Sequence, residues 1–206
     1  MVKKLTGEDK NAISAAVAEA ERRTSAEIAV VVSPTSDAYQ AYLLLYGFAA
    51  GSIVAALLWW TKALTPFPAL LAIQGIFMAL FAFAPFLKTP CLKLLPKRLL
   101  HYYASRRAAL EFQSLSRHVP AGRPIVLIYV SLAERYAHII HSRAIGLKIP
   151  APAWDTIIAE LTGLVKNAGL RQACVTAVGR VASVLSPHFP DAGEANALSD
   201  GVAEKN

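Results

Sequence analysis

The sequence predicts an α/β domain that is interrupted by a two-helix transmembrane hairpin. Two uncharged runs of 24 and 25 residues lie in the first half of the chain, and strand-like segments lie on both sides of them. The 206 residues are 55% hydrophobic and only 17% charged, against about 25% charged in an average soluble domain. This composition excludes an intrinsically disordered chain and disfavours an ordinary soluble enzyme.

Residues 1–37 predict a helix followed by a strand, which together form the first part of the domain. Thr6 is the expected N-cap of the helix, because acidic residues follow it in the first turn, and apolar residues recur at helical spacing until about Arg23. Ala26–Ser33 is a β-branched run that ends at Pro34, as expected of a strand.

Two apolar runs within residues 38–90 predict a pair of transmembrane helices, Tyr42–Trp60 and Pro68–Leu87. Each is close to the roughly 20 residues that a helix needs to cross the hydrocarbon core. Lys62 is the sole charged residue in either run or in the short loop between them. Two buried core helices of a soluble protein are the alternative, but soluble helices of this length usually carry a charged face.

Basic residues after the second run predict the orientation of the hairpin. Residues 88–123 hold eight basic residues and one acid, Glu111, so they account for the whole net charge of +7. This concentration argues against a generally basic nucleic-acid binder. Cytoplasmic loops carry the excess of Lys and Arg, so we expect a multi-pass protein of the bacterial cytoplasmic (inner) membrane with both termini inside. Six of the cations lie near the second span and are predicted to face the membrane surface: Lys88, Lys93, Lys97, Arg98, Arg106 and Arg107.

Two interpretations of the segment 91–115 stay open. It mixes leucines, tyrosines and cations, which suits a helix lying on an anionic leaflet. The same composition suits a solvated basic helix whose charges only fix the topology.

Residues 91–190 predict the basic juxtamembrane helix and the second part of the α/β domain, and residues 191–206 predict a disordered tail. Because Ala26–Ser33 needs a partner strand and the other strands all follow the hairpin, we expect the spans to be an insertion within one domain. The predicted elements are a helix over Leu99–His118, a strand over Pro124–Ser131, a turn, a hairpin partner over Arg135–Ser142, a helix after Pro150 and Pro152 that Gly169 closes, and a last helix over Leu170–Leu185.

The sequence contains no strong catalytic or cofactor motif, neither a phosphate-binding P-loop nor a dinucleotide fingerprint. Cys91 and Cys174 are solitary, so we interpret them as free thiols in a reducing cytosol, with palmitoylation of Cys91 as the alternative. His138 and His141 are three residues apart on a predicted strand, so alternation sends them to opposite faces and no paired metal site is expected.

Three segments resemble the TPM domain family, which is named for thylakoid lumen, photosystem and modulator-of-levamisole-receptor proteins. They are Thr24–Val32 (TSAEIAVVV), Pro124–Ser131 (PIVLIYVS) and Glu134–Ile140 (ERYAHII). The later Pro150…Trp154-Asp155 and His188-Phe189-Pro190 resemble a bacterial membrane branch of that family, with two spans inserted after the first strand. The resemblance covers roughly Leu5–Pro190.

The resemblance implies a small α/β/α sandwich. Members of the family are linked to acid phosphatase activity, membrane-complex repair and receptor modulation, and some bind a divalent metal. This chain has Ser142-Arg143-Ala144 where the family has an Asp-Arg-Gly-like turn, and Ala121-Gly122-Arg123-Pro124 where it has a Gly-Asn-Gly-type loop. These departures remove a carboxylate and a glycine, so no catalytic residue is carried over.

Two functions follow as hypotheses. The first is a non-enzymatic membrane module without a cofactor, whose TPM-like domain faces the cytoplasm and binds, assembles or repairs a complex with another membrane protein. The second is a phosphatase or related hydrolase assisted by a divalent metal. In that case the candidate acids are Glu27, Glu134 and Asp155. The sequence makes no prediction about the oligomeric state.

Overall fold

The computed structural model describes residues 5–63, 66–83, 85–120, 122–191 and 203–204, with the backbone alone at 85–89 and 203–204. The chain divides into two compact units. The first comprises Met1–Ser36 and His101–Asn206, and the second is Asp37–Leu100. The sequence places these divisions after residues 37 and 90.

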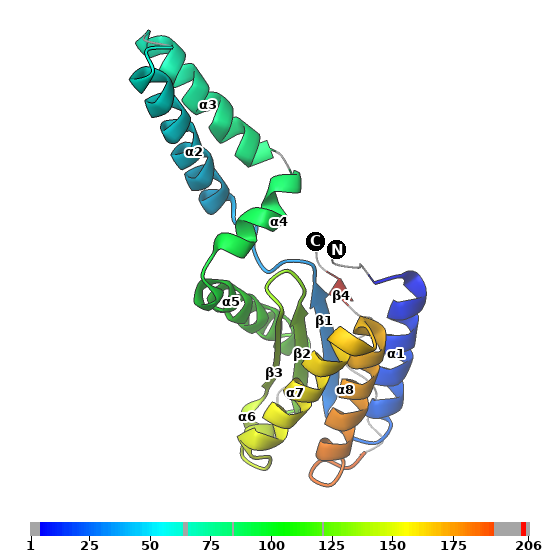
Figure 1. Ribbon diagram of the computed structural model, residues 1–206. Coiled ribbons are helices and arrows are strands. Elements are labelled where there is room, and N and C mark those ends of the chain that lie inside the picture. Colours follow the sequence, from blue (N-terminus) through cyan, green and yellow to red (C-terminus); the bar gives the residue numbers. More distant parts are fainter. Residues whose placement is uncertain (1–4, 64–65, 84, 121, 192–202, 205–206) are drawn as a thin grey trace. The chain divides into compact units, whose positions relative to one another are not determined.

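A four-stranded sheet in the order β3-β2-β1-β4 forms the centre of the first unit (Figure 1). β1 (Glu27–Ser33) and β2 (Ile125–Ser131) are parallel and paired along their whole lengths, and β3 (Tyr136–His141) is antiparallel to β2. Every residue of β2 is buried, as the apolar run predicts. β1 precedes the apolar runs and β2 follows them, so these runs lie between two paired strands of one sheet in the sequence.

β4 (Ala203–Glu204) pairs in parallel with Val31 and Val32 of β1. Within the tail that the sequence predicts to be disordered, these two residues therefore form a strand instead, because the edge of β1 offers their backbone hydrogen-bond partners. Residues 192–202 and 205–206 of the predicted tail lie outside the described residues.

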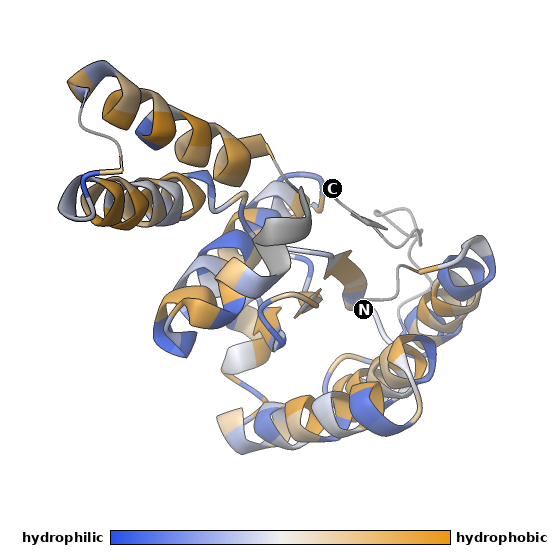
Figure 2. Ribbon diagram, turned by 45° about the horizontal axis from the view of Figure 1, so that its top comes forward, coloured by the Kyte–Doolittle hydropathy of each residue, from blue (hydrophilic) through white to orange (hydrophobic). Residues whose placement is uncertain are grey.

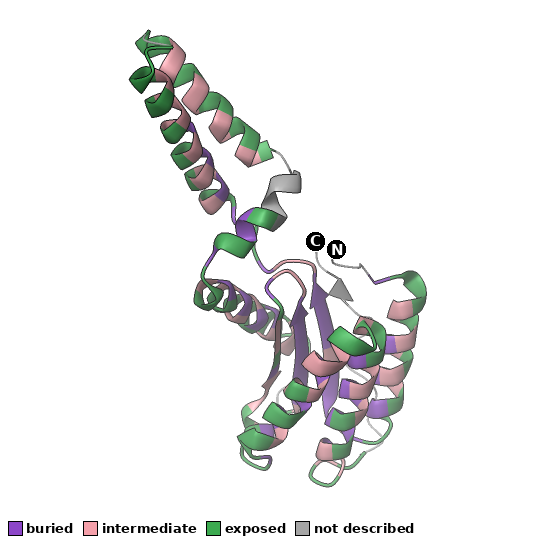
Figure 3. Ribbon diagram, in the orientation of Figure 1, coloured by how far each residue is buried: buried purple, intermediate pink, exposed green. Residues whose placement is uncertain are grey.

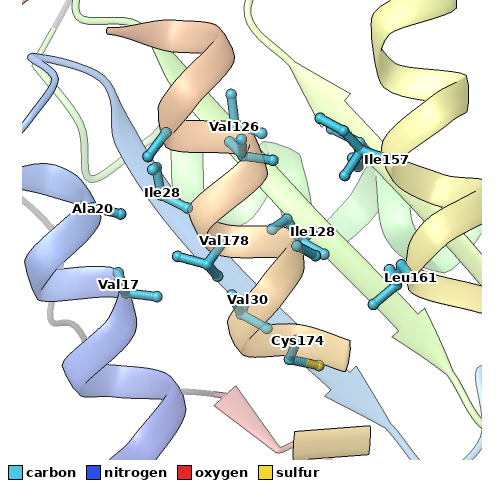
Figure 4. Close-up of a cluster of buried hydrophobic side chains, with 14 of the residues drawn as sticks. Val17, Ala20, Ile28, Val30, Val126, Ile128, Ile157, Leu161, Cys174 and Val178 are labelled. Carbon is cyan, nitrogen blue, oxygen red and sulfur yellow. The ribbon is translucent and has the colours of Figure 1, made fainter. Parts of the chain in front are cut away.

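Helices cover both faces of this sheet, which makes three layers. α1 (Gly7–Glu21), α7 (Ala151–Asn167) and α8 (Leu170–Leu185) cover the face that holds Val30. α5 (Lys97–Ser116), from His101 onward, covers the face that holds Val31. The larger core lies on the first face, where Figure 4 labels Val17, Ala20, Ile28, Val30, Val126, Ile128, Ile157, Leu161, Cys174 and Val178. The predicted mixed α/β class is confirmed.

Local sequence signals explain most of the element boundaries. Thr6 and Asp9 form a reciprocal capping box, in which the Asp9 N–H donates to Thr6 Oγ1 at 3.2 Å and the Thr6 N–H donates to Asp9 Oδ2 at 3.0 Å. Gly169 has φ +90° between α7 and α8, a conformation that suits glycine. The short α6 (Arg143–Gly146) is absent from the sequence prediction, because four residues carry too little periodicity to indicate a helix.

The second unit contains α2 (Gln40–Trp60), α3 (Phe67–Phe83) and α4 (Pro85–Leu94). The prediction of one helix continuing to Leu87 is wrong at that end, because α3 ends at Phe83 and a separate helix begins at Pro85, which has no backbone N–H to donate. α2 is long and apolar enough to cross a membrane, whereas α3 is a shorter apolar helix of 17 residues.

Candidate functional site

The most distinctive feature of the second unit is the apolar outer surface of α2 and α3. Figure 2 shows both helices largely in the colour of hydrophobic residues, and Figure 3 shows few buried positions on them. Only 17% of the most apolar 18-residue stretch of α2 is buried, whereas a core helix of a soluble protein is mostly buried. Large apolar side chains with 46% to 84% exposure are Leu45, Phe48, Ile53, Leu57, Trp59, Trp60, Phe67, Leu71, Ile76, Leu80 and Phe83.

Two glycines four residues apart allow α2 and α3 to pack closely. A Cβ atom on Gly47 would lie 2.9 Å from the Met78 Cα and the Phe77 carbonyl oxygen. A Cβ atom on Gly51 would lie 3.1 Å from Phe77 Cβ. Small residues of this kind let helix backbones approach each other in membranes. The GFAAG spacing in an apolar run is the sequence signal that would have identified this interface.

A polar link joins the same two helices. The Gln74 side-chain amide donates to the Phe48 carbonyl oxygen at 2.7 Å, and the Ser52 hydroxyl donates to Gln74 Oε1 at 3.2 Å. Near the carboxyl end of α3, the Gln40 amide of α2 donates to the Ala82 carbonyl oxygen at 3.2 Å. These polar side chains therefore find partners inside the hairpin, as an apolar environment requires.

The six cations predicted to face the membrane surface do not behave alike. Arg107 is half-buried, and its Nε lies 3.0 Å from Oε1 of the buried Glu111, so it forms an ion pair within α5. The side chain of Lys88 lies outside the described residues. The other four side chains are exposed, on α4 and α5: Lys93, Lys97, Arg98 and Arg106.

A chain of buried hydroxyl groups ends on a carboxylate at the carboxyl ends of β1 and β2. Ser131 Oγ donates to Glu134 Oε2, and Ser36 Oγ donates to Ser131 Oγ at 2.8 Å. The Tyr129 hydroxyl lies 3.0 Å from Ser36 Oγ. Because the Ser36 proton is given to Ser131, Tyr129 is the donor in this pair. Glu134 Oε1 accepts in addition the Ser36 N–H at 2.8 Å and the Thr35 hydroxyl at 3.2 Å.

This cluster occupies the edge where open α/β sheets commonly bind ligands. Its groups are nevertheless turned toward one another, and Glu134 is only 4% exposed. Burial raises the pKa of the Tyr129 hydroxyl, so it remains a hydrogen-bond donor at neutral pH. The arrangement fixes the segment that follows β1 to the turn after β2. It holds the point at which the chain leaves the first unit.

The three acids that the hydrolase hypothesis names are not brought together. Glu27 is buried at the start of β1 and forms an ion pair with Arg123 at 3.0 Å. Glu134 lies at the other end of this strand, about 20 Å away at the usual rise of a strand. Asp155 is exposed on α7. Among the residues that the structure describes, no group of three or more His, Cys, Asp and Glu is placed to hold a metal ion.

The two histidines of β3 face opposite sides of the sheet, as alternation predicts. The His141 ring stacks on Trp154 of α7 with a centroid distance of 5.2 Å, whereas the His138 ring lies 5.9 Å from Tyr136 on the α5 side. Partial loss of hydration lowers the pKa of His138, and the nearby Asp155 opposes this shift. No paired histidine site forms on this strand.

Both cysteines are free and buried, which confirms the interpretation as free thiols. Burial raises the pKa of Cys174 to about 12. Cys91, the alternative palmitoylation site, is 6% exposed. Neither thiol lies at a reactive surface.

A scan against protein-family models finds no match, and a search of curated proteins finds none either. Among solved structures, the chain is similar to the NMR structure of BA42 protein from the psychrophilic bacterium Bizionia argentinensis, with a TM-score of 0.61 and 18% sequence identity. The match covers 98% of this chain and 97% of that chain. At this identity, the similarity shows a shared fold and no more.

Proposed function

We propose that this protein is a multi-pass protein of the bacterial cytoplasmic membrane, whose TPM-like α/β domain is a non-enzymatic module for binding, assembly or repair of a membrane protein complex. The observation that carries the proposal is the apolar α2–α3 hairpin, which in the sequence is inserted between the paired strands β1 and β2. An apolar surface of this extent needs a cover of lipid or protein.

The dimensions of the hairpin suit a bilayer. At 1.5 Å per residue, α2 is about 31 Å long and α3 about 25 Å, against about 30 Å for the hydrocarbon core. A shorter helix is accommodated by local thinning of the bilayer. Trp59 and Trp60 end α2, where amphipathic rings favour the headgroup layer. The two spans we propose are therefore α2 and α3 themselves.

The charge distribution supports an orientation with both termini in the cytoplasm. Inverting the hairpin would carry the cations that follow α3 across the membrane. The loop between the spans has a single cation, Lys62, so the proposed orientation moves far less positive charge. The α/β domain would then lie in the cytoplasm, beside other proteins of the same membrane.

Within the described ranges of the chain, the reactive side chains do not form one site, which favours a binding role over hydrolysis. Glu27 and Glu134 are engaged by Arg123 and by the hydroxyl chain respectively, in the part of the domain that the structure describes. A metal-assisted phosphatase needs clustered oxygen ligands, and no observation favours that second hypothesis. The TPM-like identity rests on the three strand segments quoted above.

Fractionation and reporter fusions test the membrane part of the proposal. We expect the full chain to stay in the membrane pellet after an alkaline carbonate wash. A green fluorescent protein fused to Asn206 should fluoresce, and alkaline phosphatase inserted after Lys62 should be active because it reaches the periplasm. Release by carbonate would contradict membrane insertion, and the opposite reporter pattern would contradict the orientation.

Affinity purification tests the binding role. The full chain is used as bait in a detergent extract, with a matched bait that carries only residues 38–96. We expect a membrane protein to be recovered by the full chain and not by the hairpin. Recovery of the bait alone in several detergents would contradict the proposal.

A further inference from the structure

We infer that the junction between α4 and α5 binds the headgroups of anionic phospholipids through Lys93, Lys97 and Arg98, with Leu94 entering the acyl boundary between them. This inference rests on the proposed membrane location and adds a lipid class to it.

The backbone bends at Leu95, and the four residues lie on the two sides of this bend, between positions 93 and 98 of the second unit. The Leu95 N–H donates to the Leu92 carbonyl oxygen at 3.2 Å, and the Leu99 N–H donates to the Pro96 carbonyl oxygen at 3.0 Å. Two separate helical segments thus meet at Leu95 and Pro96. Pro96 explains the break, because it disfavours helical geometry in the residue before it.

Burial separates the junction into two kinds of residue. Leu92 and Leu95 are each 8% exposed, whereas Leu94 is 72% exposed. Lys93 directly precedes Leu94 and is exposed, as are Lys97 and Arg98 at the start of α5. An exposed leucine flanked by cations is the pattern of an interfacial segment, in which the apolar side chain enters the lipid and the cations stay at headgroup level.

The charges of the junction have no counterpart among the residues that the structure describes. No Asp or Glu occurs between residues 88 and 110, and in the described parts of the chain Lys93, Lys97 and Arg98 form no ion pair. Arg107 differs, because Glu111 neutralises it. An anionic phosphodiester is the chemistry that complements three exposed cations beside an apolar side chain.

The position along the chain fits the same partner. Lys93 follows Phe83, the last residue of α3, by ten residues, which is within the distance over which juxtamembrane cations meet the anionic leaflet. A free anion such as phosphate would use the cations but would gain nothing from Leu94.

The test uses the full chain in non-ionic detergent and measures binding of phosphatidylglycerol and phosphatidylcholine by native mass spectrometry. The variant K93Q/K97Q/R98Q removes the three cations. Its matched control, R143Q/K166Q/R171Q, removes three exposed cations from α6, α7 and α8. Because a cation near an anionic surface is worth about fivefold in affinity, we expect the first variant to bind phosphatidylglycerol about 100-fold more weakly and the control to match the wild type.

A second variant isolates the contribution of the leucine. Leu94→Gln keeps every charge, and we expect about tenfold weaker binding of phosphatidylglycerol with no change toward inorganic phosphate. Equal affinity of the wild type and the triple variant for phosphatidylglycerol would overturn the inference. So would binding of inorganic phosphate as tight as that of the lipid. In either case retention after the carbonate wash leaves the proposed function standing, whereas release by that wash contradicts the proposed function itself.

Discussion

Gly47 shows how the lack of one side chain sets the geometry of an apolar helix pair. The atoms that a Cβ would meet at 2.9 Å include the Met78 Cα and the Phe77 carbonyl oxygen. Both belong to the backbone, so a side-chain rotation cannot relieve the clash. Gly75, on the facing helix α3, has open space around its own hypothetical Cβ. The close packing of the two helices therefore requires a glycine at position 47 but not at position 75.

The first prediction compares the same substitution at these two glycines. Gly47→Ala should destabilise the hairpin by about 1–3 kcal/mol, the usual cost of overpacking. Gly75→Ala should be neutral or slightly stabilising, because alanine favours the helix and meets no neighbour. Thermal unfolding of the full chain in detergent measures both. Equal effects at the two positions would contradict the close approach of α2 and α3.

The second prediction concerns the carboxylate at the end of the hydroxyl chain. Glu134→Gln replaces one of the two carboxylate oxygens with an amide –NH2 group, which cannot accept a hydrogen bond. Either the Ser131 hydroxyl or the Ser36 N–H then loses its acceptor, and burial leaves no water to compensate. We expect a loss of about 2–3 kcal/mol in the free energy of unfolding. Glu160→Gln is the control, because its pair with Arg180 is half exposed and is worth about 0–1 kcal/mol. Urea denaturation followed by circular dichroism distinguishes the two variants. A similar small loss of unfolding free energy in both would show that the chain of hydroxyl groups contributes little to the stability of the protein.

Individual elements were predictable where the signal is local. The predicted helix over Leu170–Leu185 coincides with α8, and the predicted strand over Ala26–Ser33 differs from β1 by one residue, because apolar periodicity and flanking Pro or Gly mark both. The carboxyl-terminal end of α3 and the existence of α6 were missed. In α3 the apolar run continues past the proline that ends the helix, so composition and backbone geometry disagree.

The contacts between elements were not predictable from the sequence. The hydroxyl chain joins Ser36 to Ser131 across 95 positions, and single hydroxyl residues carry no distinguishing pattern. Gln74 stands out as a polar residue in an apolar run, yet its partners Phe48 and Ser52 lie on another helix. The pair of Arg107 with Glu111 is different, because it lies within α5 and its spacing of four residues is a sequence signal for an ion pair in a helix.

The third prediction tests the packing of α8 through its thiol. Cys174 is fully buried, and its pKa of about 12 leaves almost no thiolate at pH 7.5. In a Cys91→Ser background, we expect a bulky maleimide to modify Cys174 only after denaturation. Gln172→Cys in a Cys91→Ser/Cys174→Ser background is the control, since position 172 is exposed on the same helix and should react in the native state. Native labelling of Cys174 at the control's rate would contradict the packing of α8 in the core.

At the scale of the whole molecule, the insertion divides the chain into an α/β domain and an apolar hairpin, and each satisfies its own packing and hydrogen bonds. The sheet of the first unit and the cores on its two faces are built from residues that lie before Asp37 and after Leu100. The second unit satisfies the polar side chains Gln40, Ser52 and Gln74 within its own hairpin. Each unit therefore has its own internal packing, although the chain passes from one to the other twice.

The last prediction follows from this division. Replacing residues 38–96 with a flexible Gly/Ser linker of about 12 residues should leave a folded α/β domain, because β1 and β2 still pair and α5 still follows the linker. The shortened chain should remain in solution after membranes are pelleted, and its circular dichroism should be lost cooperatively on heating. The matched control keeps the full length but exchanges the same residues for a shuffled apolar sequence, which should stay with the membranes. A shortened chain that is unfolded, or that still sediments with the bilayer, would show that the domain needs the hairpin for its own stability or carries a second membrane contact.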